Sequence, residues 1–308
     1  MTDFCPEGNR IDRPENLTAM RSRDTLTRAM QTGMILEADA TLCDIGHNLC
    51  VDLGCMRGII PREEGAMGIR EGTVRDIAIL SRVGRPVCFI VKDILSDSGE
   101  PMAVLSRADA QRRCVAEYLS ALIPGDVIPA RVTHLEPFGA FCDVGCGVVA
   151  LMPIDTISVS RIEHPDERFS VGVNIHAVIK SRVGTRITLS HKELLGTWAE
   201  NASRFAVGET VTGIVRSIEN YGAFVELTPN LAGLAELRDD LTVGSRVSVY
   251  IKNIIPARMK VKLVVIDTIS EPVLNSGIGY YITEGHIDRF VYSPSDCERV
   301  IATDFFTQ

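Results

Sequence analysis

Residues 124–152 have the sequence "PGDVIPARVTHLEPFGAFCDVGCGVVALM", and residues 207–235 have the sequence "VGETVTGIVRSIENYGAFVELTPNLAGLA". The two stretches align without a gap at an offset of 83 residues. Each has a glycine followed by an acidic residue near its start, continues with alternating apolar residues, and reaches the same aromatic–Gly–Ala–Phe sequence. Similarity of this length at one fixed spacing indicates a duplicated structural unit.

Each unit continues with two further segments of alternating apolar residues. The first has "VGVNIHAVIKS" (171–181) and "TRITLSH" (185–191), and the second has "VGSRVSVYIKNII" (243–255) and "KVKLVVI" (260–266). A period of two, rich in Val and Ile and interrupted by Gly and Asp, is typical of short β-strands. Five strands are therefore predicted in each unit, and a small closed sheet is favoured because closure leaves no exposed strand edge.

A weaker third copy precedes these two units. Residues 32–64, "TGMILEADATLCDIGHNLCVDLGCMRGIIPREE", follow the same plan at a shift of about 91 residues from the unit at 124–192. Its later strands are expected at 85–95 and 101–110. Where the other units have the aromatic–Gly–Ala–Phe sequence, this copy has "HNLC" (His47–Cys50), so it keeps the frame without the aromatic rings.

The segments between the units are predicted to be helical, because they combine good helix formers with an apolar stripe at a spacing of about four residues. In residues 191–205 this stripe consists of Leu194, Trp198, Ala202 and Phe205. A further helix is expected near 15–31. The predicted division of the chain is an N-terminal helical segment (1–32), a degenerate repeat (33–110), a helical connector (111–123), a repeat (124–192), a helical connector (193–206), a repeat (207–268) and a C-terminal tail (269–308).

Composition limits the possible classes of protein. The 308 residues suit two or three domains, and the net charge of −8 as a whole argues against a nucleic-acid binder. The acidity lies at the two ends, however, with −3 over residues 1–123 and −4 over residues 269–308. The repeats at 124–192 and 207–268 are close to neutral, and a neutral module can present a locally basic face.

The cysteines and the apolar runs favour a cytoplasmic protein. No apolar run approaches the roughly 20 residues that span a bilayer, and the acidic N-terminus does not resemble a secretory signal. Nine scattered cysteines do not suggest a disulfide framework. Cys142 and Cys146 have the closest spacing to a metal motif, but small core side chains in a strand explain them better than zinc, and no metal or cofactor is predicted.

The repeated aromatic residues suggest a binding surface. Two rings three residues apart would lie on opposite faces of a regular strand, but the intervening glycine permits a bend after which both face outward. Phe138 with Phe141, and Tyr221 with Phe224, would then form platforms on which unpaired bases stack. The alternative is that Phe141 and Phe224 belong to the core. The exchange of Phe for Tyr at the first position keeps an aromatic ring and favours a surface role there.

Cations near the predicted platforms would follow a phosphate backbone. The late strands of the two units and the long loop 155–169 supply them, and solvated surface charges are the alternative for each one. The predicted nucleic-acid contacts from these elements are Lys180, Arg182, Arg186, Arg161, His164, Arg258, Lys260 and Lys262, with Arg168 as a further cation of the loop.

The three units resemble the S1 RNA-binding repeat, first described in the largest protein of the small ribosomal subunit. The resemblance rests on the opening "PGDV" or "VGET", then "FGAF" or "YGAF", then "GVVALM" or "LAGLAE", and on "TRITLSH". The whole chain resembles a short, Firmicutes-type ribosomal S1 protein. The family implies tandem five-stranded oligonucleotide-binding (OB-fold) barrels, single-stranded RNA as the ligand, and a role in translation initiation.

The resemblance also implies residue roles and partners. The ligand-facing aromatics of the family fall on Phe138, Phe141, Tyr221 and Phe224, and its late-strand arginine falls on Arg186. Pro153 and Glu236 stand where the family often has a histidine, and no aspartate precedes Arg186. The third unit also has only a short "RDDLT" loop, so its affinity for RNA is left open. Leading repeats without aromatics dock on protein in the family, which points to residues 33–110 as the contact with the small ribosomal subunit.

Three classes of function are compatible with parts of this sequence. The favoured one is an all-β, non-catalytic protein that binds mRNA as part of the translation apparatus. A protein-interaction scaffold, or an RNA-regulatory factor acting away from the ribosome, is the alternative. An enzyme is disfavoured, because the repeats and connectors occupy nearly all of residues 33–268 and leave no segment large enough for a catalytic domain.

Overall fold

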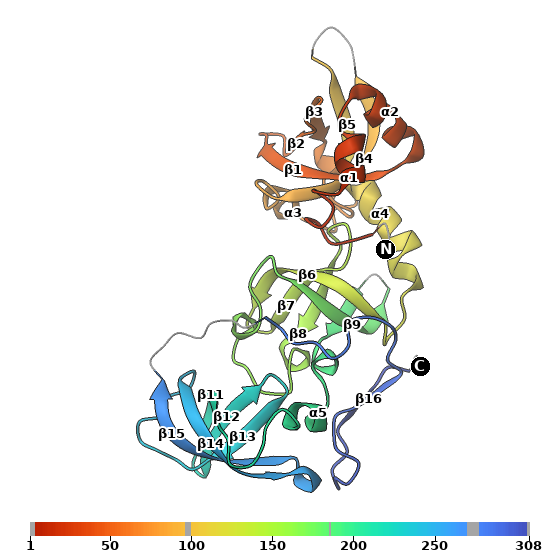
Figure 1. The fold of residues 1–308 in the computed structure, drawn as a ribbon. Helices are drawn as coiled ribbons and strands as arrows, with labels where there is room; N and C mark the ends of the chain where they lie inside the picture. The colour runs from red at the N-terminus through yellow and green to blue at the C-terminus, as the bar shows by residue number, and fades with distance from the viewer. Residues whose placement is uncertain (1–3, 96–99, 185, 270–276, 307–308) are drawn as a thin grey trace. The chain divides into compact units, whose positions relative to one another are not determined.

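The computed structural model describes residues 4–95, 100–184, 186–269 and 277–306. Three closed five-stranded barrels dominate it, which confirms the predicted tandem OB-fold architecture (Figure 1). All three barrels have the same connectivity: four neighbouring pairs run antiparallel in the first and third barrels, and the third strand of each barrel pairs in parallel with its last. Closure leaves the short strands without open edges.

The first barrel contains β1 (Ile35–Cys43), β2 (Leu49–Asp52), β3 (Arg57–Ile60), β4 (Pro86–Leu95) and β5 (Met102–Ser106), in the order β1-β2-β3-β5-β4. Two helices precede it, α1 (Pro14–Ala19) and α2 (Arg23–Thr32), and α3 (Ile77–Leu80) lies between β3 and β4. Ser22 and Thr25 form a capping box at the start of α2, and Gly33 ends that helix in the left-handed conformation. The single helix expected near 15–31 is therefore two helices.

The second and third barrels repeat this plan. The second contains β6 (Val127–Glu136), β7 (Gly139–Asp143), β8 (Val149–Pro153), β9 (Asn174–Val183) and β10 (Arg186–Ser190). The third contains β11 (Thr210–Glu219), β12 (Gly222–Thr228), β13 (Leu231–Ala235), β14 (Arg246–Ile255) and β15 (Lys260–Ile269). Inward side chains such as Ala223, Val225 and Ile251 alternate with outward ones along each strand, so the period of two in the sequence produces one buried face.

The repeated glycine is required by close packing of the backbone. A Cβ atom at Gly139 would lie 2.4 Å from the carbonyl oxygen of Met152, and one at Gly222 would lie 2.6 Å from that of Ala235. Gly222 also has a φ of +155°, at the margin of the region that favours glycine. The glycine therefore lets the neighbouring third strand approach, in addition to permitting the turn into the second strand.

The connectors are shorter helices than the sequence suggested. The first is α4 (Arg107–Glu117), capped by the Ser106 side chain, and a 3₁₀ turn at 119–121 follows it. The second is a 3₁₀ turn at 192–195 and α5 (Trp198–Ala202), because Gly196 interrupts the helix with a φ of +83°. The predicted apolar stripe is nevertheless buried, since Leu194 and Trp198 pack in one core with the third barrel.

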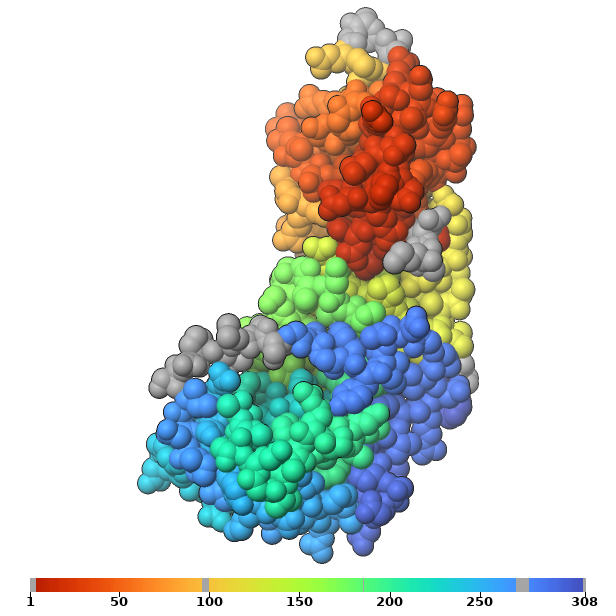
Figure 2. Space-filling model, viewed as in Figure 1, coloured from red at the N-terminus to blue at the C-terminus, as the bar shows by residue number. Residues whose placement is uncertain are grey.

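The C-terminal tail contains a two-stranded antiparallel ribbon, β16 (Arg289–Val291) and β17 (Ala302–Asp304). Backbone hydrogen bonds join Tyr281 to Leu194 and Ile287 to Gly125. In the space-filling view the tail, in dark blue, covers part of the same face as the green and cyan residues (Figure 2). The tail thus packs on the barrels through main-chain contacts.

The chain divides into two compact units. One consists of residues 1–122 with 129–131 and 142–149, and the other contains the remaining residues from 123 onward. Within the described segments, no helix is long and apolar enough to cross a membrane, and no group of three or more His, Cys, Asp or Glu is arranged to hold a metal ion. Cys142 and Cys146 are fully buried thiols.

Candidate nucleic-acid interface

The second barrel presents a pair of aromatic rings. Phe138 lies in the turn between β6 and β7, and Phe141 lies on β7. Their ring centroids are 5.9 Å apart with an interplanar angle of 90°, so the edge of one ring meets the face of the other. Phe138 is 55% exposed and Phe141 is half-buried. The glycine between them thus places both rings on one side of the barrel with aromatic surface facing solvent.

The third barrel repeats this geometry. Tyr221 and Phe224 have centroids 6.2 Å apart, again at 90°, and Tyr221 is 64% exposed. The half-buried second ring supports the exposed first ring in both barrels. The structure therefore contains two similar aromatic platforms of the kind on which bases stack.

His134 extends the platform of the second barrel, and the sequence reasoning missed it. Its ring lies 6.2 Å from that of Phe141 at an angle of 28°, and its Nε2 is 2.8 Å from a carboxylate oxygen of Glu136. The Thr133 hydroxyl donates to the Phe141 carbonyl, which fixes β6 beside β7. Strict alternation would turn His134 inward with Ala130 and Val132, which are buried, so the period-two pattern contained no signal for its exposed position.

The strand register identifies equivalent cations in the two barrels. Thr188 pairs with Leu151 on β8, and Lys262 pairs with Leu234 on β13, 83 residues after Leu151. Arg186 precedes Thr188 by two residues and Lys260 precedes Lys262 by two. Arg186 and Lys260 therefore occupy the same position at the start of the last strand and point to the same face.

The remaining predicted cations are mostly exposed on late strands or their turn. Lys180 and Arg182 lie on β9, and Arg258 lies in the turn between β14 and β15. In the third barrel a row of paired residues crosses the sheet from Phe224 through Leu234 to Lys262. A ring, an aliphatic side chain and a cation therefore lie side by side on one outer surface.

The long loop at 155–169 is bound to the third barrel through Arg168. The Arg168 guanidinium forms an ion pair with Glu226, and the Glu226 carboxylate also accepts from Arg216 Nε at 2.8 Å. The Arg168 and Arg216 side chains are each 8% exposed and that of Glu226 is 5% exposed. The suggestion that Arg168 serves as a free cation for RNA is therefore wrong, because its charge is used inside the protein.

The other two predicted residues of the loop differ from Arg168. His164 Nδ1 accepts a hydrogen bond from the Asp166 amide at 3.2 Å and caps the 3₁₀ turn at 165–167. Arg161 is exposed and lies beside the acidic Glu163 and Asp166 in a smaller cavity. Of the three basic side chains in this loop, Arg161 is the one that reaches solvent most freely.

The first barrel lacks both rings and cation at the equivalent positions. The register runs from Cys50 on β2 to Ile59 on β3 and Val104 on β5, so Cys50 corresponds to Phe224 and Met102 corresponds to Lys260. His47 Nδ1 lies 2.8 Å from Asp76, within the barrel's own loop. The equivalent row on this barrel is therefore apolar.

A buried histidine supports the second barrel behind the late strands. His191 donates from Nδ1 to the Ile157 carbonyl at 2.9 Å, and its Nε2 is 3.0 Å from the Tyr280 hydroxyl of the tail. Burial lowers the pKa of His191 to about 4, although the hydrogen bond to Ile157 opposes this shift. The imidazole is thus neutral at physiological pH and joins the tail to the barrel.

Comparison with known proteins agrees with the geometry. Residues 122–192 match the S1 RNA binding domain family. The small ribosomal subunit protein bS1 of Staphylococcus aureus is 31% identical over 233 residues, which is 72% of this chain and 56% of that protein. The bS1 protein of Staphylococcus haemolyticus is 30% identical over 230 residues. The chain thus spans little more than half the length of these relatives.

A solved multidomain protein with nucleic acid binding domains from Streptococcus pneumoniae aligns with 79% of this chain and 76% of its own. Its sequence identity to this chain is 14% and the TM-score is 0.25. The match over residues 122–192 and the identity to bS1 confirm the resemblance found in the sequence. The chain carries an S1 RNA-binding domain and is related to the ribosomal S1 proteins.

Proposed function

We propose that this protein binds single-stranded RNA, mRNA in particular, through its second barrel and assists translation initiation without catalysis. The observation that carries the proposal is the exposed Phe138–Phe141 pair, with His134 beside it and Arg186 on the last strand. Stacking on aromatic rings contributes roughly 1–3 kcal/mol per base and tolerates any sequence. Lys180 and Arg182 would add phosphate contacts that weaken with salt.

The third barrel is proposed as a secondary RNA site. It has the equivalent rings Tyr221 and Phe224, and Lys260 stands where the second barrel has Arg186. Lys262 and Arg258 provide further exposed charge. Because lysine binds phosphate as a point charge and lacks the planar fork of arginine, weaker binding is expected here.

The first barrel, residues 33–110, is proposed to attach the protein to the small ribosomal subunit in the cytoplasm. Its row Cys50–Ile59–Val104 contains neither a ring nor a cation, although Cys50 is buried and the Arg57 guanidinium lies 3.7 Å from its sulfur, and Leu42 beside the row is 49% exposed. An apolar row suits contact with protein better than contact with phosphates. The bS1 relatives are named as small-subunit proteins, which supports the same assignment.

The test is titration of a single-stranded RNA oligonucleotide at two salt concentrations. The double variant Phe138→Ala with Phe141→Ala should weaken binding at least tenfold, and Arg186→Gln should weaken it and flatten the salt dependence. Matched substitutions at Tyr221 and Phe224 should have a smaller effect. Binding that does not respond to salt or to the ring variants would contradict the proposal, and sedimentation with small subunits tests the ribosomal attachment separately.

A further inference from the structure

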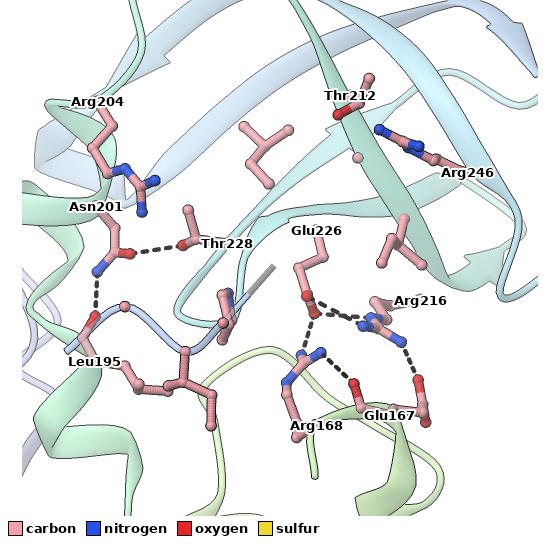
Figure 3. Close-up of a pocket in the computed structure, with 17 residues that line it drawn as sticks. Glu167, Arg168, Leu195, Asn201, Arg204, Thr212, Arg216, Glu226, Thr228 and Arg246 are labelled. Carbon is pink, nitrogen blue, oxygen red and sulfur yellow. Dashed lines mark hydrogen bonds and ion pairs between the residues drawn. The ribbon is translucent and has the colours of Figure 1, made fainter. Parts of the chain in front are cut away.

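A cavity of about 380 Å³ lies beside the third barrel (Figure 3), and neither Tyr221 nor Phe224 is among its lining residues. Its walls come from the loop at 167–168, the connector at 195–204, strands β11, β12 and β14, and tail residues 277–279. All of these segments belong to the same compact unit of the protein. The cavity is therefore built by several separate parts of one unit.

Arginine dominates the charged lining of this cavity. Four arginines and two glutamates line it, which leaves a surplus of positive charge in a chain whose net charge is −8. Arg216 pairs with both Glu167 and Glu226, and Arg168 pairs with Glu226. These four side chains neutralise one another and form a rigid, largely buried wall.

The other two arginines have no such partner. Neither Arg204 nor Arg246 has a hydrogen bond or ion pair from its side chain to any other residue that the structure describes. Arg204 enters the cavity from the connector and Arg246 from the start of β14, on opposite sides, with the Thr212 hydroxyl near Arg246 (Figure 3). Arg204 is exposed and Arg246 is half-buried, so both can reach an anionic molecule that enters the cavity from solvent.

The size and the apolar lining restrict the anion. A volume near 380 Å³ falls within the range of small-molecule sites, and a bare phosphate would leave most of it unfilled. Leu195, Ile214 and Leu227 also line the cavity and offer apolar contact to an organic group. We propose that this cavity binds a phosphate ester of the size of a nucleoside monophosphate, with Arg246 and the Thr212 hydroxyl holding the phosphate and Arg204 facing the organic group from the other side.

This site is separate from the aromatic platform of the third barrel. Phe224 and Glu226 lie two residues apart on the same face of β12, so the Glu226 ion pairs stand between the rings and the cavity. RNA stacked on Tyr221 and Phe224 would have to cross this wall to enter. The proposal therefore does not depend on the RNA-binding function, and either one can fail alone.

Titration of the full chain with AMP tests the site, and two readouts are available. Trp198 is the only tryptophan and lies on α5, the helix that also carries the lining residue Asn201, so its fluorescence should respond. Equilibrium dialysis with labelled AMP detects binding that leaves the fluorescence unchanged. Arg246→Gln should weaken binding about tenfold or more, because it removes a charge-assisted contact to phosphate, and Arg204→Gln should weaken it by a smaller factor.

The controls separate this site from the RNA surface. Arg258→Gln, which removes an exposed arginine of the same barrel outside the cavity, should leave AMP binding unchanged, and so should Phe138→Ala with Phe141→Ala. Competition by inorganic phosphate would support the phosphate site and a free phosphate ester as its ligand. Competition by a 5′-phosphorylated RNA oligonucleotide, but not by its unphosphorylated form, would support the site and identify an RNA end as the ligand. Absence of saturable binding by AMP and by both phosphate competitors, or binding that survives both arginine substitutions, would overturn the proposal.

Discussion

Glu7→Gln should destabilise the N-terminal unit more than any substitution of a surface carboxylate. Glu7 is 5% exposed and accepts two hydrogen bonds from Arg107, at 2.6 and 2.9 Å. It also accepts from the Cys88 amide at 3.1 Å and lies 3.4 Å from Arg82. Burial alone would raise the pKa of Glu7, but the Arg107 guanidinium and its hydrogen bonds hold it below the ordinary value.

The magnitude follows from what the substitution leaves behind. A neutral amide at position 7 would leave Arg107, whose side chain is 4% exposed, as a buried cation without the carboxylate that pairs with it directly, and only the more distant carboxyl of Asp143 would remain nearby. Breaking a buried pair in this way typically costs about 3–5 kcal/mol, whereas loss of an exposed charge costs well under 1 kcal/mol. The matched control is Glu15→Gln, because Glu15 is exposed in the first turn of α1.

Denaturant unfolding with two probes measures the effect. Circular dichroism follows the unfolding of both units, whereas Trp198 fluorescence reports only the unit that contains Trp198. Glu7→Gln should therefore shift the unfolding transition seen by circular dichroism to lower denaturant and leave the transition seen by fluorescence in place. The second substitution Arg107→Met in the Glu7→Gln background should recover part of the loss, since it removes the unpaired charge. A Glu7→Gln protein as stable as Glu15→Gln would refute the reasoning.

Three further predictions concern the second and third barrels. Because the pKa of His191 is lowered to about 4, the unfolded chain binds a proton near pH 6.5 that the folded chain does not bind. The free energy of unfolding should therefore fall by up to about 3 kcal/mol as the pH falls from 6.5 to 4. His191→Asn should flatten this pH profile. Gly139→Ala should cost about 1–3 kcal/mol in thermal or denaturant unfolding, because its Cβ would meet the Met152 carbonyl oxygen at 2.4 Å. Glu226→Gln should lower the stability seen by Trp198 fluorescence by about 3–5 kcal/mol, because Arg168 and Arg216 would share the single carboxylate of Glu167.

The fold was predictable because its signals are local. Alternating apolar residues specify strands over short windows, and the duplication at an offset of 83 residues showed where each barrel repeats. The aromatic platform was predictable for the same reason, since Phe138, Gly139 and Phe141 lie within four residues. The replacement of the platform by His47–Cys50 also followed from alignment of the repeats, and the register bears out that Cys50 takes the place of Phe224.

The buried charge networks were not predictable, because their partners are far apart in the chain. Glu226 is 58 residues from Arg168, and the Glu7 amide donates to Asp143 across 136 residues. A sequence window shows each of these residues only as a charged side chain among others on a surface. The prediction that Arg168 contacts RNA has this origin. Nothing in the residues next to Arg168 in the sequence shows that its guanidinium forms an ion pair with a carboxylate of another barrel.

A buried carboxylate follows the second ring of the aromatic platform in both barrels. On β12 the side chains of Phe224 and Glu226 lie on the same outer face, and the loop that carries Arg168 covers Glu226. An RNA strand on Tyr221 and Phe224 therefore meets protein one step further along β12. In the second barrel the corresponding position on β7 is Asp143, which is also buried. Its carboxylate accepts from the amides of Gly145 and Gly147 in its own turn and from the Glu7 amide of the N-terminal segment. A single strand on Phe138 and Phe141 therefore meets protein at the same step, so the expected preference for the second barrel rests on Arg186, where the third barrel has Lys260.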